Sequence, residues 1–169
     1  MAVRARLGGA AVSAVLLALM AAAAITAVGL ARADPPRGEA AATVTVTDAQ
    51  GDVIAREPLP ADGAFDLTYR HSVYGVPARE RFAALPDGGF QLLAVSSPSE
   101  AVLDYYGVAG ARRQAGGWWR LELAEPPAHD RLPLIATPRG RRTLVVAEAV
   151  TALYPSEGSR HLVVAVTRR

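Results

Sequence analysis

The sequence predicts an all-β fold, an antiparallel β-sandwich or small barrel of about eight or nine short strands, preceded by an N-terminal signal or transmembrane helix. Short apolar runs alternate with a period of two, Pro-, Asp- and Gly-rich turns separate them, and only one stretch of the domain has a helical pattern. The chain has 169 residues, 51% of them hydrophobic, which is enough for one packed domain. The absence of cysteine excludes a disulfide scaffold, thiolate metal sites and a cysteine nucleophile.

Residues 1–33 have the pattern of a signal peptide or membrane anchor. Leu7–Ala31 is an uncharged run dominated by Ala, Val and Leu, and Arg4 and Arg6 precede it. Its length suits the roughly 20 residues that span a bilayer, whereas the sequence Ala-Arg-Ala at its end suits cleavage after Ala33. Both alternatives place the rest of the chain outside the cytoplasm, because the two arginines hold the N-terminus inside.

Residues 34–41, DPPRGEAA, predict a linker, and residues 42–169 an extracytoplasmic β domain. From residue 34 onward 15 Arg stand against 16 Asp and Glu, so this part is nearly neutral. It has no basic patch with interleaved aromatic residues, which is the usual footprint of a nucleic-acid-binding surface. We therefore expect no nucleic-acid partner.

The expected strands follow one another at close spacing. Thr43–Thr47 is a strict alternation of β-branched residues, and Phe65, Leu67 and Tyr69 alternate with polar residues. The full set is 43–47, 53–56, 65–69, 79–84, 90–95, 118–123, 132–136, 143–150 and 162–167. The turns between them are typical of antiparallel connections.

The region between the fifth and sixth expected strands is predicted to be irregular. Ser97–Tyr105 is the one helical candidate, with Ser97 or Ser99 as its cap. Gly107–Gly117 lacks any nucleotide-binding spacing and is expected to be a flexible loop. Trp118 and Trp119 follow it, and because adjacent strand residues face opposite sides, one is expected to be buried and the other at the rim.

A hairpin is predicted within residues 65–82, where two strand-like runs flank the sequence VYGVP. Pairing Tyr69 with Phe82 and Leu67 with Ala84 keeps the apolar side chains on one face. A register shifted by one residue would set Tyr69 against a charged side chain.

The preferred register places His71 opposite Glu80 at the loop end of the sheet. Three uses of this pair remain open. The two side chains can satisfy each other and fix the hairpin, in which case the effects of removing both would be less than additive. They can bind a polar solute together with Ser72 and a nearby Arg. They can also belong to a catalytic or metal site.

The catalytic and metal alternatives have little support. The other histidines, His129 and His161, lie in no metal-binding spacing, and no GxSxG motif occurs. We therefore expect no enzymatic activity, no cofactor and no metal, with a His/Glu-dependent hydrolase as the least favoured alternative.

The hairpin resembles that of a bacterial family, domain of unknown function 1850. The residues YRHSV at 69–73, Pro77 and the residues ERF at 80–82 are similar to the family pattern Y-x-H-S-V followed by P-x-x-E-x-F. Residues 105–110, YYGVAG, resemble a segment that in the family usually continues to Leu-Pro, which is absent here. The resemblance covers Phe65–Tyr154. The candidate site residues are then Tyr69, His71, Ser72, Glu80, Gly107 and Gly110.

The resemblance implies a role beside a transporter. Members of the family are small exported or membrane-anchored proteins, commonly encoded beside or fused to permeases of tripartite ATP-independent periplasmic (TRAP) transporters that use TAXI-type solute receptors. It implies an extracytoplasmic transporter accessory with a permease or solute receptor as partner, and it brings no established activity. The alternative is an extracytoplasmic module that binds a small solute or another part of the cell envelope.

Overall fold

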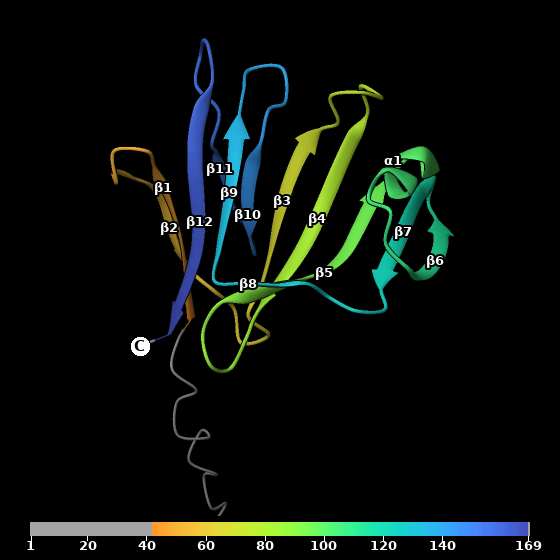
Figure 1. The fold of residues 1–169 in the computed structure, drawn as a ribbon, viewed down its shortest axis with the longest axis horizontal. Helices are drawn as coiled ribbons and strands as arrows, with labels where there is room; N and C mark the ends of the chain where they lie inside the picture. Colours follow the sequence, from red (N-terminus) through yellow and green to blue (C-terminus); the bar gives the residue numbers. More distant parts are fainter. Residues whose placement is uncertain (1–41, 169) are drawn as a thin grey trace, which may run out of the picture. The chain divides into compact units, whose positions relative to one another are not determined.

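The computed structural model describes residues 42–168, and within them the fold is almost entirely β-sheet (Figure 1). The predicted signal or anchor of residues 1–33, its cleavage site and the linker of residues 34–41 lie outside the described residues. Within 42–168 no helix combines the length and apolarity needed to cross a membrane. The all-β class predicted from the period-two alternation is confirmed.

The described part contains twelve strands and one short helix. They are β1 (Ala42–Asp48), β2 (Val53–Pro58), β3 (Ala64–Arg70), β4 (Pro77–Ala84), β5 (Phe90–Ser97), α1 (Glu100–Tyr105), β6 (Gly110–Ala115), β7 (Trp118–Leu123), β8 (Ala128–His129), β9 (Arg131–Ala136), β10 (Thr143–Val146), β11 (Ala149–Ala152) and β12 (Arg160–Arg168).

The strands form two open antiparallel sheets in a sandwich-like arrangement. The small sheet has the order β2-β1-β12-β9, and the large sheet has the order β11-β10-β3-β4-β5-β7-β6, with β8 paired to β5. Val44 and Val164 of the small sheet belong to the same buried cluster as Phe65 and Phe82 of the large sheet. The inner faces of the two sheets therefore supply one hydrophobic core.

The estimate of eight or nine strands is too low, because three observed strands, β6, β8 and β11, are missing from the expected set. Strand β8 has only two residues, Ala128 and His129, and pairs with β5. The expected single strand 143–150 is a tight hairpin, β10 and β11, which turns at Ala147 with a φ of +48°. The sequence at this turn contains no Asn-Gly or Asp-Gly pair, the usual signals that predict a two-residue hairpin turn. The expected flexible loop 107–117 contains β6, which pairs along its whole length with β7.

Helix α1 is shorter than expected and covers the inner side of β5 and β7 with Val102 and Leu103. Ser99 occupies the N-cap position without a side-chain hydrogen bond, and the hydroxyl oxygen of Ser97 accepts the N–H of Ser99 instead. The helix ends before Gly107, whose φ of +63° is the left-handed conformation that closes many helices.

The predicted register of the β3–β4 hairpin is wrong by four residues. Tyr69 pairs with Ala78 rather than with Phe82, and Leu67 pairs with Glu80 rather than with Ala84. The strand reaches back to Pro77, because a proline is tolerated as the first residue of a strand. A shift by an even number of residues preserves the faces, so the side chains of Tyr69 and Glu80 remain on the same face.

Candidate functional site

His71 is held in the turn that joins β3 to β4, and not opposite Glu80 within the ladder as predicted. Its backbone N–H donates to the carbonyl of Val76 over 2.8 Å, and its carbonyl accepts the N–H of Gly75 over 2.8 Å. The turn needs a left-handed residue at Gly75, where φ is +66°. The turn thus fixes the backbone from which the imidazole projects.

The imidazole of His71 is buried, and its orientation is set by the turn backbone. The Nδ1 atom accepts the N–H groups of Val73 at 3.3 Å and of Tyr74 at 3.4 Å. An imidazole nitrogen that accepts carries no hydrogen, so the neutral ring has its proton on Nε2. Within residues 42–168 this Nε2–H group has no protein acceptor, which leaves it available as a donor.

Tyrosine rings surround this imidazole. The ring of Tyr105 meets it edge to face with centroids 4.8 Å apart, and the ring of Tyr74 lies 5.1 Å away. Tyr69 contributes a third ring at 6.3 Å. Because Tyr105 is 64% exposed, the aromatic wall that it forms faces the solvent.

Glu80 lies nearby on the inner face of the large sheet, a position that an apolar residue would ordinarily fill. Its Oε1 atom accepts the hydroxyl of Tyr106 over 2.6 Å, and its Oε2 atom accepts Nη1 of Arg142 over 3.3 Å. The side chains of Glu80 and Arg142 are only 14% and 19% exposed. The carboxylate is therefore neutralised by one partner and hydrogen bonded by both.

Two phenols extend this cluster. The hydroxyls of Tyr69 and Tyr106 are hydrogen bonded to each other, and since the Tyr106 proton goes to Glu80, Tyr69 is the donor of the pair. The guanidinium carbon of Arg142 lies 4.5 Å from the centroid of the Tyr69 ring, a cation–π contact. Tyr69, Tyr106, Glu80 and Arg142 form what we call the buried polar cluster.

The buried polar cluster and His71 line one hollow of about 470 Å³. Its lining residues come from the β3–β4 turn, the end of α1 and the β9–β10 connection. The two connections lie at the upper end of the view in Figure 1, and α1 lies to their right. Its lining is Tyr69, Arg70, His71, Ser72, Glu80, Tyr105, Tyr106, Ile135, Thr137, Gly140 and Arg142.

The hollow contains four of the six residues expected at the site, namely Tyr69, His71, Ser72 and Glu80. Gly107 and Gly110 do not line it. Gly107 ends the helix, and Gly110 lies so close to β7 that a Cβ atom there would be 2.0 Å from the carbonyl oxygen of Glu122. These glycines shape the segments beside the site without lining it.

Arg142, Tyr105 and Tyr106 were missed by the sequence interpretation. The solute hypothesis called for an arginine near Glu80 without identifying it, and Arg142 is 62 residues away along the chain. Only the pairing of β10 with β3 brings it to the hairpin. Tyr105 belongs to the segment that resembles the family pattern, but nothing in its spacing points to His71.

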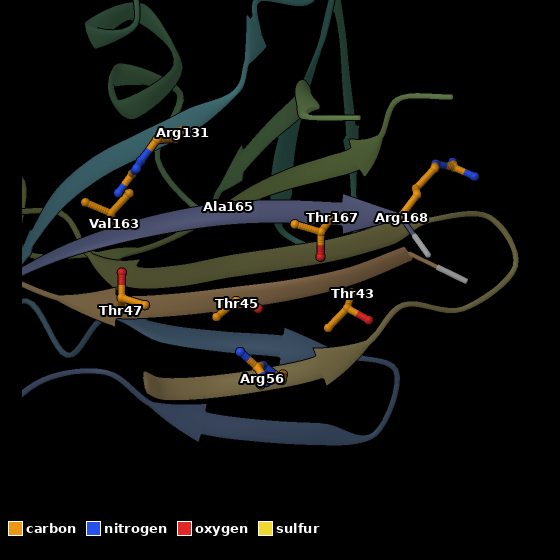
Figure 2. Close-up of a pocket in the computed structure, with 9 residues that line it drawn as sticks. All are labelled: Thr43, Thr45, Thr47, Arg56, Arg131, Val163, Ala165, Thr167 and Arg168. Carbon is orange, nitrogen blue, oxygen red and sulfur yellow. The ribbon is translucent and has the colours of Figure 1, made fainter. Parts of the chain in front are cut away.

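A larger hollow, of about 600 Å³, lies on the outer face of the small sheet and has a different character. Figure 2 shows Thr43, Thr45 and Thr47 along β1, with Arg56 beside them and Arg131 beyond the neighbouring strand. Its floor is a regular ladder of short side chains, and no buried polar group converges on it. This surface therefore lacks the converging polar groups that distinguish the hollow at His71.

Within residues 42–168 no three His, Asp or Glu side chains gather as metal ligands would. Comparison of the chain with known protein families, curated proteins and solved structures finds no match. The functional argument therefore depends on the site itself.

The phenols of the buried polar cluster give a prediction for alkaline pH. Burial, followed by the charge of Glu80, raises the pKa of Tyr69 from 10.0 to about 12, and the same causes raise the pKa of Tyr106. Above pH 10 the unfolded chain loses these protons while the folded chain keeps them, so the free energy of unfolding falls as the pH rises toward 12.

Tyrosinate absorbance and denaturant unfolding across this pH range would test the prediction. Tyr69→Phe should reduce by one the number of phenols that lose their protons only well above pH 10. If all five tyrosines ionised together near pH 10 in protein that is still folded, the burial of this pair would be contradicted.

Proposed function

We propose that the domain binds a small polar solute rich in hydrogen-bond acceptors, in the hollow between His71 and Arg142, as an extracytoplasmic accessory of a solute transporter. The observation that supports this most is the convergence of polar and aromatic side chains from three distant segments on one hollow. Ligand sites typically combine such a concave aromatic wall with a few fixed polar groups.

The preference for acceptors follows from the hydrogen bonds already made. Both oxygens of Glu80 are occupied, by Tyr106 and Arg142. The remaining groups at the hollow are mainly donors: Nε2–H of His71, the further N–H groups of Arg142 and the exposed hydroxyl of Ser72. A solute with carboxylate or carbonyl oxygens would satisfy them.

A hydrolase is less well supported. His71 has Nδ1 engaged by backbone N–H groups, and within residues 42–168 no serine or threonine hydroxyl is hydrogen bonded to its ring. The hydroxyl bound to Glu80 belongs to Tyr106, whose raised pKa makes it a poor nucleophile. Binding without chemistry is the simpler use of this arrangement.

The transporter role is supported by two features of the sequence. Residues 1–33 carry the export pattern, and residues 69–82 resemble a family associated with TRAP transporters of the TAXI type. We propose a permease or solute receptor as the partner and the outer side of the cytoplasmic membrane as the location. Cross-linking of the exported protein in cells, followed by identification of the captured partner, tests this part separately.

The solute-binding part is tested by thermal unfolding of the full chain. We expect pyruvate, succinate or glutamate to raise the melting temperature in a saturable way, whereas the donor-rich solutes ethanolamine and putrescine should not. Tyr105→Ala and Ser72→Ala should abolish the rise, because both side chains lie at the exposed side of the hollow.

Ser156→Ala is the matched control for Ser72→Ala, since both serines are exposed and Ser156 is not among the residues that line the hollow. It should leave the rise unchanged. A rise that survives in Tyr105→Ala and Ser72→Ala, or no rise with any of the carboxylates, would overturn the proposed solute site.

A further inference from the structure

We propose a second binding site, on the outer face of the large sheet, for a planar solute that carries a dianionic oxyanion, such as an aryl phosphate. The site consists of Arg79, Arg113, Arg120 and Trp118, with Ser96 and Ala115 among them, and we call it the arginine–tryptophan site. It goes beyond the proposed function, because it shares no residue with the hollow at His71.

The three arginines lie in one row across adjacent strands. Arg79 on β4 pairs with Ser96 on β5, Ser96 pairs with Arg120 on β7, and Arg120 pairs with Arg113 on β6. Neighbouring strands are about 4.8 Å apart, so the Cα atoms of Arg79 and Arg120 are about 10 Å apart with the short Ser96 between them. Arginine side chains on either side of that gap are long enough to bind one oxyanion together.

The charges in this row are poorly compensated. Arg113 and Arg120 are direct cross-strand partners, an arrangement that destabilises a sheet when both side chains carry the same charge. Arg120 is ion-paired with Glu122, whereas within residues 42–168 neither Arg79 nor Arg113 has an ion-pair partner. Three positive charges and one negative charge leave two positive charges, which match a dianion.

The neighbouring arginines show the contrast. Arg81, one row away on the same face, has carboxylate oxygens of Asp62 and Asp66 within 3.7 Å. Arg112, which lies within β6 on the opposite face, is ion-paired with both Glu100 and Asp104. Arg81 and Arg112 are thus balanced by carboxylates, whereas the row at Ser96 is left with unbalanced positive charge.

Trp118 supplies the preference for a planar group. Its side chain is 38% exposed and lines the hollow of about 520 Å³ beside the three arginines, with small side chains at Ser96 and Ala115 leaving room. Among the described residues a cation–π contact joins Arg142 to Tyr69, and none involves Trp118. The indole face of Trp118 is therefore not covered by a guanidinium. An aromatic ring of a ligand can stack there while its phosphate is bound by the arginines.

Fluorescence of Trp118 tests the proposal. The chain has two tryptophans, so Trp119→Phe leaves Trp118 as the sole emitter. We expect phenyl phosphate to change the emission of Trp118 in a saturable titration at constant ionic strength. Its affinity should be at least about tenfold higher than that of inorganic phosphate or of phenol. Arg79→Gln and Arg113→Gln should each weaken the binding about tenfold or more.

Two controls locate the site. Arg56→Gln removes an exposed arginine on the outer face of the small sheet and should not change the affinity. Ser72→Ala should also leave it unchanged, which separates this site from the hollow at His71. Calorimetric titration of the unmodified chain and of Arg113→Gln gives the same comparison without Trp119→Phe, in case that variant does not fold.

Equal affinity for inorganic phosphate and phenyl phosphate would overturn the planar part of the proposal. Equal affinity for phenol and phenyl phosphate, or unchanged affinity in Arg79→Gln and Arg113→Gln, would overturn the anion site as a whole.

Discussion

Glu80→Ala is expected to lower the free energy of unfolding by about 3 kcal/mol, because it breaks a largely buried ion pair by removing one partner. Arg142, 19% exposed at its side chain, would lose its carboxylate, and the Tyr106 hydroxyl would lose its acceptor. Urea unfolding followed by circular dichroism gives the change directly.

Double-mutant cycles measure which residues are energetically coupled to Glu80. The effects of Glu80→Ala and Tyr106→Phe should be coupled by about 0.5 kcal/mol or more, since the two side chains are hydrogen bonded. Glu80→Ala and His71→Ala should be nearly additive, because these residues share no hydrogen bond and are not opposite each other. Coupling to His71 without coupling to Tyr106 would contradict this arrangement and restore the pairing expected from the sequence.

Phe82→Ala is expected to cost about 4 kcal/mol, the largest effect of a single substitution that we predict. Phe82 is 2% exposed, its ring stacks on Phe65 at 5.2 Å, and its edge meets Phe90 at 5.6 Å. Its removal leaves a cavity beside the rings of Phe65 and Phe90, and the close-packed sheets can fill that cavity only in part.

Val150→Ala is the control for Phe82→Ala, because Val150 is 69% exposed on β11. Chemical denaturation of both variants should show a loss within about 0.5 kcal/mol for the control. A loss below about 1 kcal/mol for Phe82→Ala would mean that the aromatic cluster is not the centre of the core.

The sequence was sufficient for the fold class and for the faces of the central strands. Alternation in Phe65, Leu67 and Tyr69 identifies the inner face whatever the register, because side chains on one face recur every second residue. The register itself was missed, since the apolar alternation permits any even shift. The stacking of Phe65 on Phe82 and the inclusion of Pro77 in β4 select the observed one.

The candidate site was predictable only in its local half. Tyr69, His71, Ser72 and Glu80 belong to one hairpin, so their proximity follows from the sequence. Arg142 directly precedes β10, and its contact with Glu80 joins residues 62 positions apart in the chain. No local sequence pattern encodes such a contact. The strands β6 and β11 were missed for a related reason: a Gly- and Arg-rich strand and a turn at Ala147 lack the usual local signals.

The nitrogen chemical shifts of His71 test the central claim, that its Nε2–H group is a donor held ready for a solute. In ¹⁵N-histidine-labelled protein, we expect the Nε2–H tautomer, because Nδ1 accepts backbone N–H groups. A carboxylate that raises the melting temperature should shift Nε2 of His71 while leaving His129 and His161 unchanged. A proton on Nδ1, or an Nε2 signal that does not respond to the saturating carboxylate, would contradict the account.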